Sequence, residues 1–538
     1  MTGQQGQTAK EIHEKEIVRK ENGKIWKIIS WTGLFFLAVL LRVLWLDKIP
    51  FGIHVDEVGM AYDAYWLARE GIDRWSMSYP VYLLNYGSGQ SALYAYLCVA
   101  LVKITGAMNV WIIRLPAVAF GLLTMVSGGA IIRKLWGERA AFLGILLMAV
   151  CPYFVMSSRL GLDCDLFLGL STLSLYLLME AVEKKKLWLF LAAGLGFGFC
   201  LYTYVLSYLI LPLFLLAGGI YLLRLRELDW KRIFCFGVPL FLLALPLMLM
   251  ILINQLGLES LKLGPFTIPR MLLYRGDEFG CYLSPARLRD LFLGLFWHDG
   301  EYCSAFPGYG TLFVWSIPLF LVGLFGMVRD CWRRRGKGKF DMRVFLLFFL
   351  AAQLIIACTI NEIFTYKLNG VFFCLVCCIL QAVEMLDTCW KSKRVGTKRW
   401  IGNWYRGIGI LYLLGGVAFG GFYFSGGGNA SYARGWYFRE PYEEAWNANI
   451  DKIGNRILYT DPNIAYFLYS TRIPPWEITE SMLENDSKVF RNLRFYLGAQ
   501  YRENAAYLVS NDNTEYQQVL VEWGYQKQYE DEHYSVWY

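Results

Sequence analysis

Charged side chains are scarce in this chain of 538 residues: Asp, Glu, Lys and Arg make up 18 % of it, whereas 56 % is hydrophobic and 17 % is aromatic. This composition excludes a string of soluble domains and indicates a protein that crosses the lipid bilayer many times. The net charge of +8 does not indicate a nucleic-acid partner, because the Lys and Arg residues fall in short clusters between apolar runs, as they do in cytoplasmic loops.

The sequence also lacks the motifs of several common sites. Its thirteen Cys residues, many of them inside apolar runs, show neither the spacing of metal ligands nor a dense disulfide framework. It contains no glycine-rich loop of the kind that cradles phosphates. Residues 1–27 are polar and have no apolar core, so we interpret them as a cytoplasmic tail rather than a cleavable signal.

Apolar runs predict an all-α polytopic membrane protein with about eleven transmembrane helices. The predicted spans are residues 28–46, 110–132, 140–156, 166–179, 187–205, 208–223, 234–253, 312–328, 344–360, 368–386 and 401–424. Because Lys184, Arg333 and Lys393 lie in charge-rich connections, the positive-inside rule places the amino terminus in the cytoplasm and the carboxyl terminus outside the cell membrane.

Within the predicted transmembrane domain, residues 28–425, two long loops face outward, residues 47–109 and 254–309. The first loop contains an apolar segment, residues 91–104, that is too short for a span of about 20 residues. We expect this segment to lie on the outer surface or to dip into it.

The composition changes sharply after residue 425. Residues 426–538 are polar, rich in Tyr, Asn, Asp and Glu, and contain no run of membrane length. Within them ILYT, AAYLVS and the final YSVWY have the pattern of strands, and TEYQQVLVEWG has that of a helix. The sequence therefore predicts a small α/β domain outside the membrane, in which no segment has the spacing of a catalytic motif.

Two adjacent carboxylates, Asp56 and Glu57, follow the first apolar run. From Val58 to Ala68 the apolar residues recur with the period of a helix, and Gly71 is expected to end it. Asp56 is expected to occupy the N-cap, where a carboxylate satisfies a backbone N–H without any chemistry. The alternative is a catalytic carboxylate at the membrane surface, and this stretch alone favours the cap.

The segment SSRLGLDCD, residues 157–165, forms the second outer turn. It places Arg159, Asp163 and Asp165 between two spans, where an unpaired ionisable group is costly. Such residues are functional candidates. The structural alternative is an ion pair between Arg159 and Asp163 that joins two helix ends.

The long outer loop 254–309 contains four arginines, including Arg270, and the motif HDGEYCSAFPGYG with His298 and Asp299. An anionic ligand would explain the arginines, and so would a solvated surface, because long loops escape the positive-inside rule. Lys367 stands at the outer start of the tenth predicted span, where it either contacts a ligand or extends its ammonium to the membrane interface.

The first outer loop with Asp56 and Glu57, the run NVWIIRLPAVAFGLLTMVSGGAIIRKLWGERAAFLGILLMAVCPYFVMSSRLGLDCDLF and the outer C-terminal domain resemble the bacterial GT-C glycosyltransferases of the protein mannosyltransferase and aminoarabinose transferase group. The resemblance is strongest over residues 28–205. It implies transfer of a sugar from a polyprenyl-phosphate carrier to a glycan, lipid or protein acceptor of the cell envelope, on the outer face.

The resemblance also implies a role for several residues. Asp56 corresponds to the proposed general base, and Glu57 to a neighbour that helps to position substrates. Arg159 corresponds to an arginine near the donor phosphate, and either Asp163 or Asp165 to an acidic residue of the second outer loop. A divalent cation, Mg²⁺ or Mn²⁺, held by Asp56 and Asp163 is a further hypothesis, because either the cation or Arg159 could stabilise the leaving phosphate.

The main alternative is a transporter or flippase of an envelope glycolipid, in which these charges would line a path. Transporters usually contain interrupted helices at the midplane and internal repeats, and the sequence shows neither clearly. A third hypothesis is a membrane scaffold in which the C-terminal domain binds a partner and Asp56 is only a helix cap. Consumption of a polyprenyl-phosphate sugar would distinguish the transferase from both.

Overall fold

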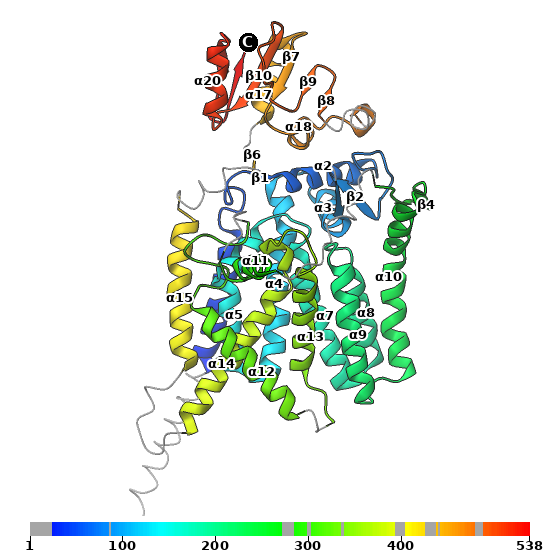
Figure 1. Cartoon of the computed structure of the whole chain (residues 1–538), viewed down its shortest axis with the longest axis vertical. Coiled ribbons are helices and arrows are strands. Elements are labelled where there is room, and N and C mark those ends of the chain that lie inside the picture. Colours follow the sequence, from blue (N-terminus) through cyan, green and yellow to red (C-terminus); the bar gives the residue numbers. More distant parts are fainter. Residues whose placement is uncertain are drawn as a thin grey trace, which may run out of the picture.

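The computed structural model describes residues 24–85, 88–271, 284–297, 303–334, 338–392, 404–425, 437–438, 442–478 and 488–538. A bundle of helices forms most of the molecule, and a small region of sheet and helices stands at one end of it (Figure 1). We call this end of the bundle the outer end, following the predicted topology; which side of the membrane it faces stays a prediction.

Each predicted span contains a helix. The helices are Lys24–Val43, α4 (Val110–Trp136), α5 (Glu138–Val150), α7 (Asp165–Lys184), α8 (Leu187–Cys200), α9 (Ser207–Arg224), α10 (Trp230–Leu256), α12 (Ser316–Arg334), α13 (Met342–Ala357), α14 (Val371–Ser392) and α15 (Trp404–Tyr423). Within the described residues, seven helices are long and apolar enough to cross a membrane. The number of eleven spans therefore stays a prediction, because α8, α12 and α13 do not meet the requirements for length and for apolar composition together.

An eighth candidate span is bent. Helix α5 is followed, after Cys151, by α6 (Pro152–Met156) and η1 (Ser157–Arg159), which turn from it by 65°. Pro152 causes the break, because its ring removes one N–H donor and disfavours helical backbone at the residue before it. The bend directs the second outer turn back towards the bundle.

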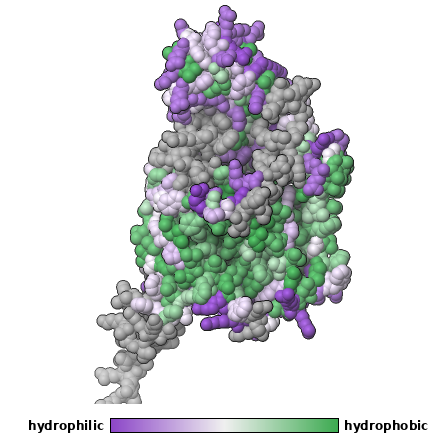
Figure 2. Space-filling view, viewed as in Figure 1, coloured by the Kyte–Doolittle hydropathy of each residue, from purple (hydrophilic) through white to green (hydrophobic). Residues whose placement is uncertain are grey.

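The surface of the bundle is hydrophobic. Figure 2 shows an apolar band across the face of the bundle in view, with hydrophilic residues on the C-terminal region above it and along the opposite rim. Large apolar side chains are exposed on the helices, among them Phe241, Phe325 and Val417. Such an extensive apolar surface is stable only when lipid covers it, which supports a multi-pass membrane protein.

A layer of short elements covers the outer end. Helices α2 (Val55–Arg69) and α3 (Ala92–Thr105) pack against each other there, and the hairpin of β2 (Tyr82–Asn85) and β3 (Ser88–Ser91) lies between them in sequence. Helix α3 contains the apolar segment 91–104, and with 14 residues it is shorter than a typical span. It lies at the surface of the bundle in Figure 1, in agreement with the sequence-based expectation.

Three further pieces complete this layer. They are the hairpin of β4 (Leu261–Leu263) and β5 (Phe266–Ile268), helix α11 (Pro285–Phe296) and the turn η4 (Thr365–Leu368). The β4–β5 hairpin extends α10 at the edge of the molecule, whereas η4 leads directly into α14.

The C-terminal region forms a six-stranded sheet in the order β11-β12-β10-β7-β9-β8. Its elements are α17 (Tyr442–Ile453), β7 (Ile457–Thr460), α18 (Ile464–Thr471), β8 (Val489–Phe490), β9 (Leu493–Arg494), β10 (Ala505–Ser510), α20 (Thr514–Glu522), β11 (Lys527–Glu530) and β12 (Tyr534–Trp537). The three strands and the helix predicted from the sequence are thus confirmed. Central strands β7 and β10 run parallel, and β12 runs antiparallel to β10.

This region rests on the start of the first outer loop. Strand β6 (Tyr437–Phe438) pairs with β1 (Ile53–His54). The hydroxyl of Tyr62 on α2 donates to the Ile473 carbonyl at 2.5 Å, and the rings of Trp66 and Trp476 meet edge to face at 5.5 Å. The C-terminal region therefore contacts the helix that carries Asp56 and Glu57.

Candidate active site

The first turn of α2 is built around His54 rather than Asp56. His54 has extended backbone (φ −68°, ψ 148°), and its Nδ1 accepts the N–H of Asp56 at 3.1 Å. In return the Glu57 carboxylate accepts the N–H of His54 at 2.8 Å, which completes a reciprocal capping box. The prediction that Asp56 is the N-cap is therefore wrong, and its side chain, 43 % exposed, is not used to cap the helix.

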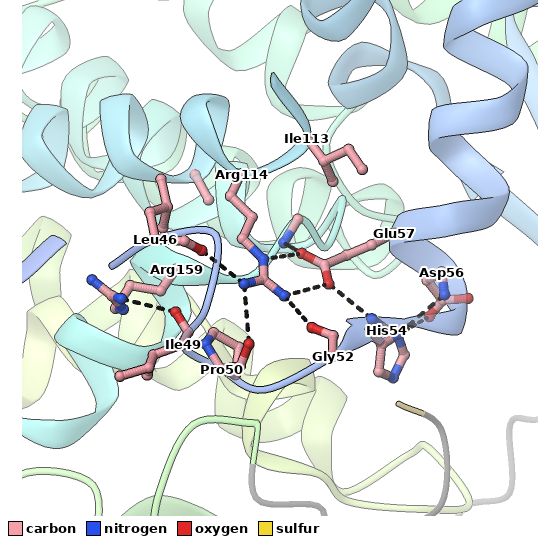
Figure 3. A network of polar contacts seen from close by, with 12 residues as sticks. Leu46, Ile49, Pro50, Gly52, His54, Asp56, Glu57, Ile113, Arg114 and Arg159 are labelled. Carbon is pink, nitrogen blue, oxygen red and sulfur yellow. Dashed lines mark hydrogen bonds and ion pairs between the residues drawn. The ribbon is translucent and has the colours of Figure 1, made fainter. Parts of the chain in front are cut away.

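Glu57 is fully buried and forms an ion pair with Arg114 of α4 (Figure 3). Two nitrogens of Arg114 contact the two Glu57 oxygens at 3.0 and 3.2 Å, and the N–H of Gly161 donates to the same carboxylate at 2.8 Å. Burial alone would raise the pKa of Glu57, but Arg114 and the two backbone N–H groups hold it below its ordinary value. Glu57 thus joins three segments of the chain and has no surface to offer a substrate.

Arg114 also fixes the path of the first outer loop. Its guanidinium donates to the carbonyls of Leu46 at 2.8 Å and Gly52 at 2.7 Å. The sequence analysis did not single out Arg114. The available signal was an arginine within an apolar span, which is costly unless it is paired.

Asp56 is oriented by a chain of polar side chains from the β2 end. The Asn85 amide nitrogen donates to Asp56 Oδ1 at 2.9 Å, and Arg74 donates to the Asn85 oxygen at 3.1 Å. Arg74 is in turn held by a buried ion pair with Asp63 at 2.6 Å. Since Arg74 can only donate and an ionised carboxylate can only accept, the Asn85 amide has one possible orientation. Sequence reasoning missed Asn85, Arg74 and Asp63.

Asp163 approaches Asp56 from the second outer turn. Its carboxylate accepts the N–H of Ser91 and that of Cys164, each at 2.8 Å. Burial raises the pKa of Asp163 to about 7, against these two bonds, and the nearby negative charge of Asp56 adds to the increase. The predicted gathering of the two acidic loops on one face is therefore observed.

Asp165 begins α7 and is buried beside the amide of Asn369. Neither of its carboxylate oxygens has a hydrogen-bond partner of ordinary geometry among the described residues. The Asn369 amide donates to the Cys164 carbonyl at 2.7 Å and is itself held by the Tyr153 hydroxyl at 2.7 Å. Asn369 thereby links the turn η4 to the acidic loop.

Arg159 does not pair with Asp163, contrary to the structural alternative. Its buried guanidinium donates to the carbonyls of Leu41, Leu44 and Ile49 at 3.0, 2.7 and 2.8 Å, which stabilises the segment after the first helix. In Figure 3 it lies on the opposite side of Arg114 from Asp56. Its expected place near a donor phosphate stays a prediction.

The remaining candidate residues are dispersed. Arg270 follows β5, and its contacts are an exposed ion pair with Glu259 at 3.2 Å and a backbone bond to Ser260. Lys367 lies in η4, its ammonium 5.1 Å from the ring centre of Phe364. His298 and Asp299 lie outside the described residues.

Within the part of the chain that the structure describes, no group of three or more His, Cys, Asp or Glu side chains could hold a metal ion. Asp56 and Asp163 supply two carboxylates, and each already accepts hydrogen bonds. The divalent cation therefore stays a prediction, and no step below uses one.

Residues 90–253 match the family model of dolichyl-phosphate-mannose-protein mannosyltransferases. Two solved structures of ArnT from Cupriavidus metallidurans resemble nearly the whole chain. The apo structure has a TM-score of 0.54 at 13 % identity, covering 96 % of this chain and 98 % of that one. The structure bound to undecaprenyl phosphate has a TM-score of 0.52 at 12 % identity, covering 95 % and 97 %. The fold is the GT-C fold.

The GT-C fold confirms the resemblance inferred from the sequence, including the all-α membrane architecture with its C-terminal sheet region. The matched family segment runs from the end of the β2–β3 hairpin to α10 and contains Arg114, Asp163 and Asp165. No protein in the curated set matches the sequence. The family model and the fold together support a membrane glycosyltransferase.

Proposed function

We propose that the protein transfers a sugar from a polyprenyl-phosphate carrier to an acceptor of the cell envelope, with Asp56 as the general base. The observation that supports this most directly is the state of Asp56: its carboxylate is partly exposed, is released from the helix cap by His54 and is oriented by Asn85. A general base needs both access to the acceptor and a fixed direction. The structure of ArnT bound to undecaprenyl phosphate supports a carrier of this chemical class.

In the proposed reaction, the acceptor hydroxyl or amine gives its proton to Asp56 as its lone pair forms a bond to C1 of the sugar. The bond between C1 and the phosphate oxygen breaks, and its electron pair leaves with the polyprenyl phosphate. The Asn85 amide donates to Asp56 Oδ1 and so holds the carboxylate in one direction for this step.

The leaving phosphate gains negative charge, which the site must stabilise. With a pKa of about 7, Asp163 holds a proton in a large fraction of molecules near neutral pH and can donate it to the phosphate. Lys367 is the second candidate, because its turn is joined through Asn369 to the loop of Asp163. Asp56 and Asp163 then act as base and acid, with Glu57 as a positioning residue behind them.

The test uses proteoliposomes of the full-length protein, labelled undecaprenyl-phosphate hexoses and pentoses, and an envelope extract as the source of acceptor. We expect the protein to release undecaprenyl phosphate. We expect Asp56→Asn to lower this rate about 10²- to 10⁴-fold, the usual contribution of a general base, with unchanged insertion and helix content. Glu70→Gln, at the exposed end of α2, is the matched control and keeps full activity.

Retained turnover in Asp56→Asn would contradict the assignment of the base. Movement of the intact lipid-linked sugar across the bilayer without release of phosphate would instead support the transporter hypothesis. If the wild type showed neither transfer nor movement, the scaffold hypothesis would be supported.

A further inference from the structure

The first helix, Lys24–Val43, packs loosely against the bundle. In its 18-residue apolar stretch, only 11 % is buried inside the protein. In the other six unbroken candidate spans of the described part of the chain, the buried share of the same stretch ranges from 22 to 78 %. Two grooves flank it. One, of about 800 Å³, lies between this helix, α5 and α15; the other, of about 650 Å³, lies towards α4. Both are lined by Trp31.

The larger groove combines apolar walls with a charged mouth. Its walls are formed mainly by Trp31, Phe142, Leu143, Leu146, Ile410 and Leu413. At its mouth stand Lys27, Glu138, Arg139 and Arg406, which lie at or near the starts of the first helix, α5 and α15.

Among the residues that line the groove, the basic Lys27, Arg139 and Arg406 outnumber the acidic Glu138, while Glu384 behind them accepts the hydroxyl of Tyr405 at 2.7 Å. Lys27 is neutralised by an ion pair with Glu138 at 2.7 Å. Arg139 and Arg406 are exposed, and neither has a hydrogen bond or an ion pair with any described residue. Two guanidinium groups therefore face the entrance of an apolar groove, an arrangement that suits an anion attached to a hydrocarbon chain.

We propose that this groove binds an anionic phospholipid, with its phosphate between Arg139 and Arg406 and an acyl chain along the wall formed by Trp31 and Phe142. The predicted topology places the mouth at the cytoplasmic leaflet, which is rich in anionic lipids. A zwitterionic lipid offers no net charge to the two arginines. The volume of about 800 Å³ lies within the range of pockets that enclose small ligands.

The bound lipid supplies packing that the protein itself does not provide. Helices in a membrane associate through close contact of their surfaces, and the first helix makes few such contacts. Its outer end leads directly into the loop that carries Asp56. A lipid in the groove therefore stabilises the helix that precedes the candidate site, whichever reaction the site performs.

Gly409 keeps the groove open. A Cβ atom at this position would lie 3.7 Å from the terminal carbons of both Leu143 and Leu146. A leucine at 409 would extend beyond that contact into the groove, and it would also favour the helical backbone. Gly409→Leu thus blocks the acyl-chain site without changing the charge at the mouth.

The test uses the purified full-length protein in detergent with phosphatidylglycerol or phosphatidylcholine, and measures the lipid retained after gel filtration by mass spectrometry. We expect selective retention of phosphatidylglycerol. We expect Arg139→Gln with Arg406→Gln to weaken its binding about 30-fold, and Gly409→Leu to abolish it. The control pair, Arg224→Gln with Arg333→Gln, removes the same charge from exposed positions away from the groove and retains the lipid.

Several results would overturn the proposal. Equal retention of phosphatidylcholine would show an apolar groove without charge selection, and equal loss in the control pair would show a general effect of charge. If the wild type retained neither lipid and a cysteine placed in residues 1–23 crosslinked to Arg139→Cys, the occupant would be the chain's own amino-terminal segment.

Discussion

The two carboxylates at the start of α2 are neighbours in the sequence, but the protein uses them in opposite ways. Glu57 turns inward, where it is fully buried against Arg114. Asp56 turns outward, where Asn85 orients it and solvent reaches it. We call the side of Glu57, Arg114 and Arg159 the closed side, and that of Asp56, Asn85 and Asp163 the open side.

The two sides differ in the free energy that is lost when a charged side chain loses its partner. A buried ion pair returns little net stability, but the loss of one partner leaves a charge without compensation in an apolar setting. A partly exposed carboxylate keeps much of its hydration and can change partners. Substitutions on the closed side should therefore change folding, and those on the open side should change chemistry.

The largest effect is expected for Arg114→Met on the closed side. It leaves Glu57 buried and unpaired, which should lower the free energy of unfolding by about 3–5 kcal/mol. Thermal unfolding in detergent measures this. The double variant Glu57→Gln with Arg114→Met should recover part of the loss, and Arg69→Met, an exposed arginine of α2, should change little. An unaltered melting temperature in Arg114→Met would show that the ion pair with Glu57 does not stabilise the fold, and would contradict the assignment of the closed side to folding.

A smaller loss of stability, about 2 kcal/mol, is expected for Arg159→Lys. An ammonium cannot replace the guanidinium fork that reaches several carbonyls after the first helix. The melting temperature and the KM for the lipid-linked donor should be measured together. A raised KM at an unchanged melting temperature would instead support the donor-phosphate role that the sequence resemblance implies.

On the open side, Asn85→Leu should lower kcat about tenfold, because Asp56 loses its donor. The control is the same substitution in the Asp56→Asn background, where no further loss is expected if Asn85 acts through Asp56. Independent, multiplied losses in the double variant would show that Asn85 has a different role.

The last prediction concerns pH. The folded-state pKa of Asp163 is raised to about 7, above its unfolded value of about 3.9, so the folded protein binds the extra proton between these values. The contribution of Asp163 to stability should therefore decline as pH rises from about 4 to 7 and then stay level. Asp163→Asn lacks this dependence. The melting temperature of the variant minus that of the wild type should therefore rise over that interval, and a constant value would contradict the raised pKa.

Much of the architecture could be predicted from the sequence, because apolar length and strand alternation are local properties. All predicted spans contain helices, although one of them is broken, and segments such as ILYT and AAYLVS are strands. The gathering of Asp56 and Asp163 on one face followed from counting spans and from the positions of the lysines and arginines.

The partners of these residues could not be predicted in the same way. Glu57 and Arg114 stand 57 positions apart, and their contact depends on how α2 lies across α4. His54 took the cap position that residue preferences give to Asp56, because its Nδ1 can accept the same N–H. Asn85 carries no pattern at all, since its role arises only when β2 is placed beside the start of α2.

The pairing of β1 with β6 has a consequence for the order of events in biosynthesis. Residues 53 and 54 leave the ribosome early, whereas their partners, residues 438 and 437, follow after every helix of the bundle. The backbone on which Asp56 is mounted thus lacks a neighbouring strand until the last span has been made and inserted. Strand β1, which leads into the helix of the candidate base, can therefore gain its partner strand only when synthesis of the chain is nearly finished.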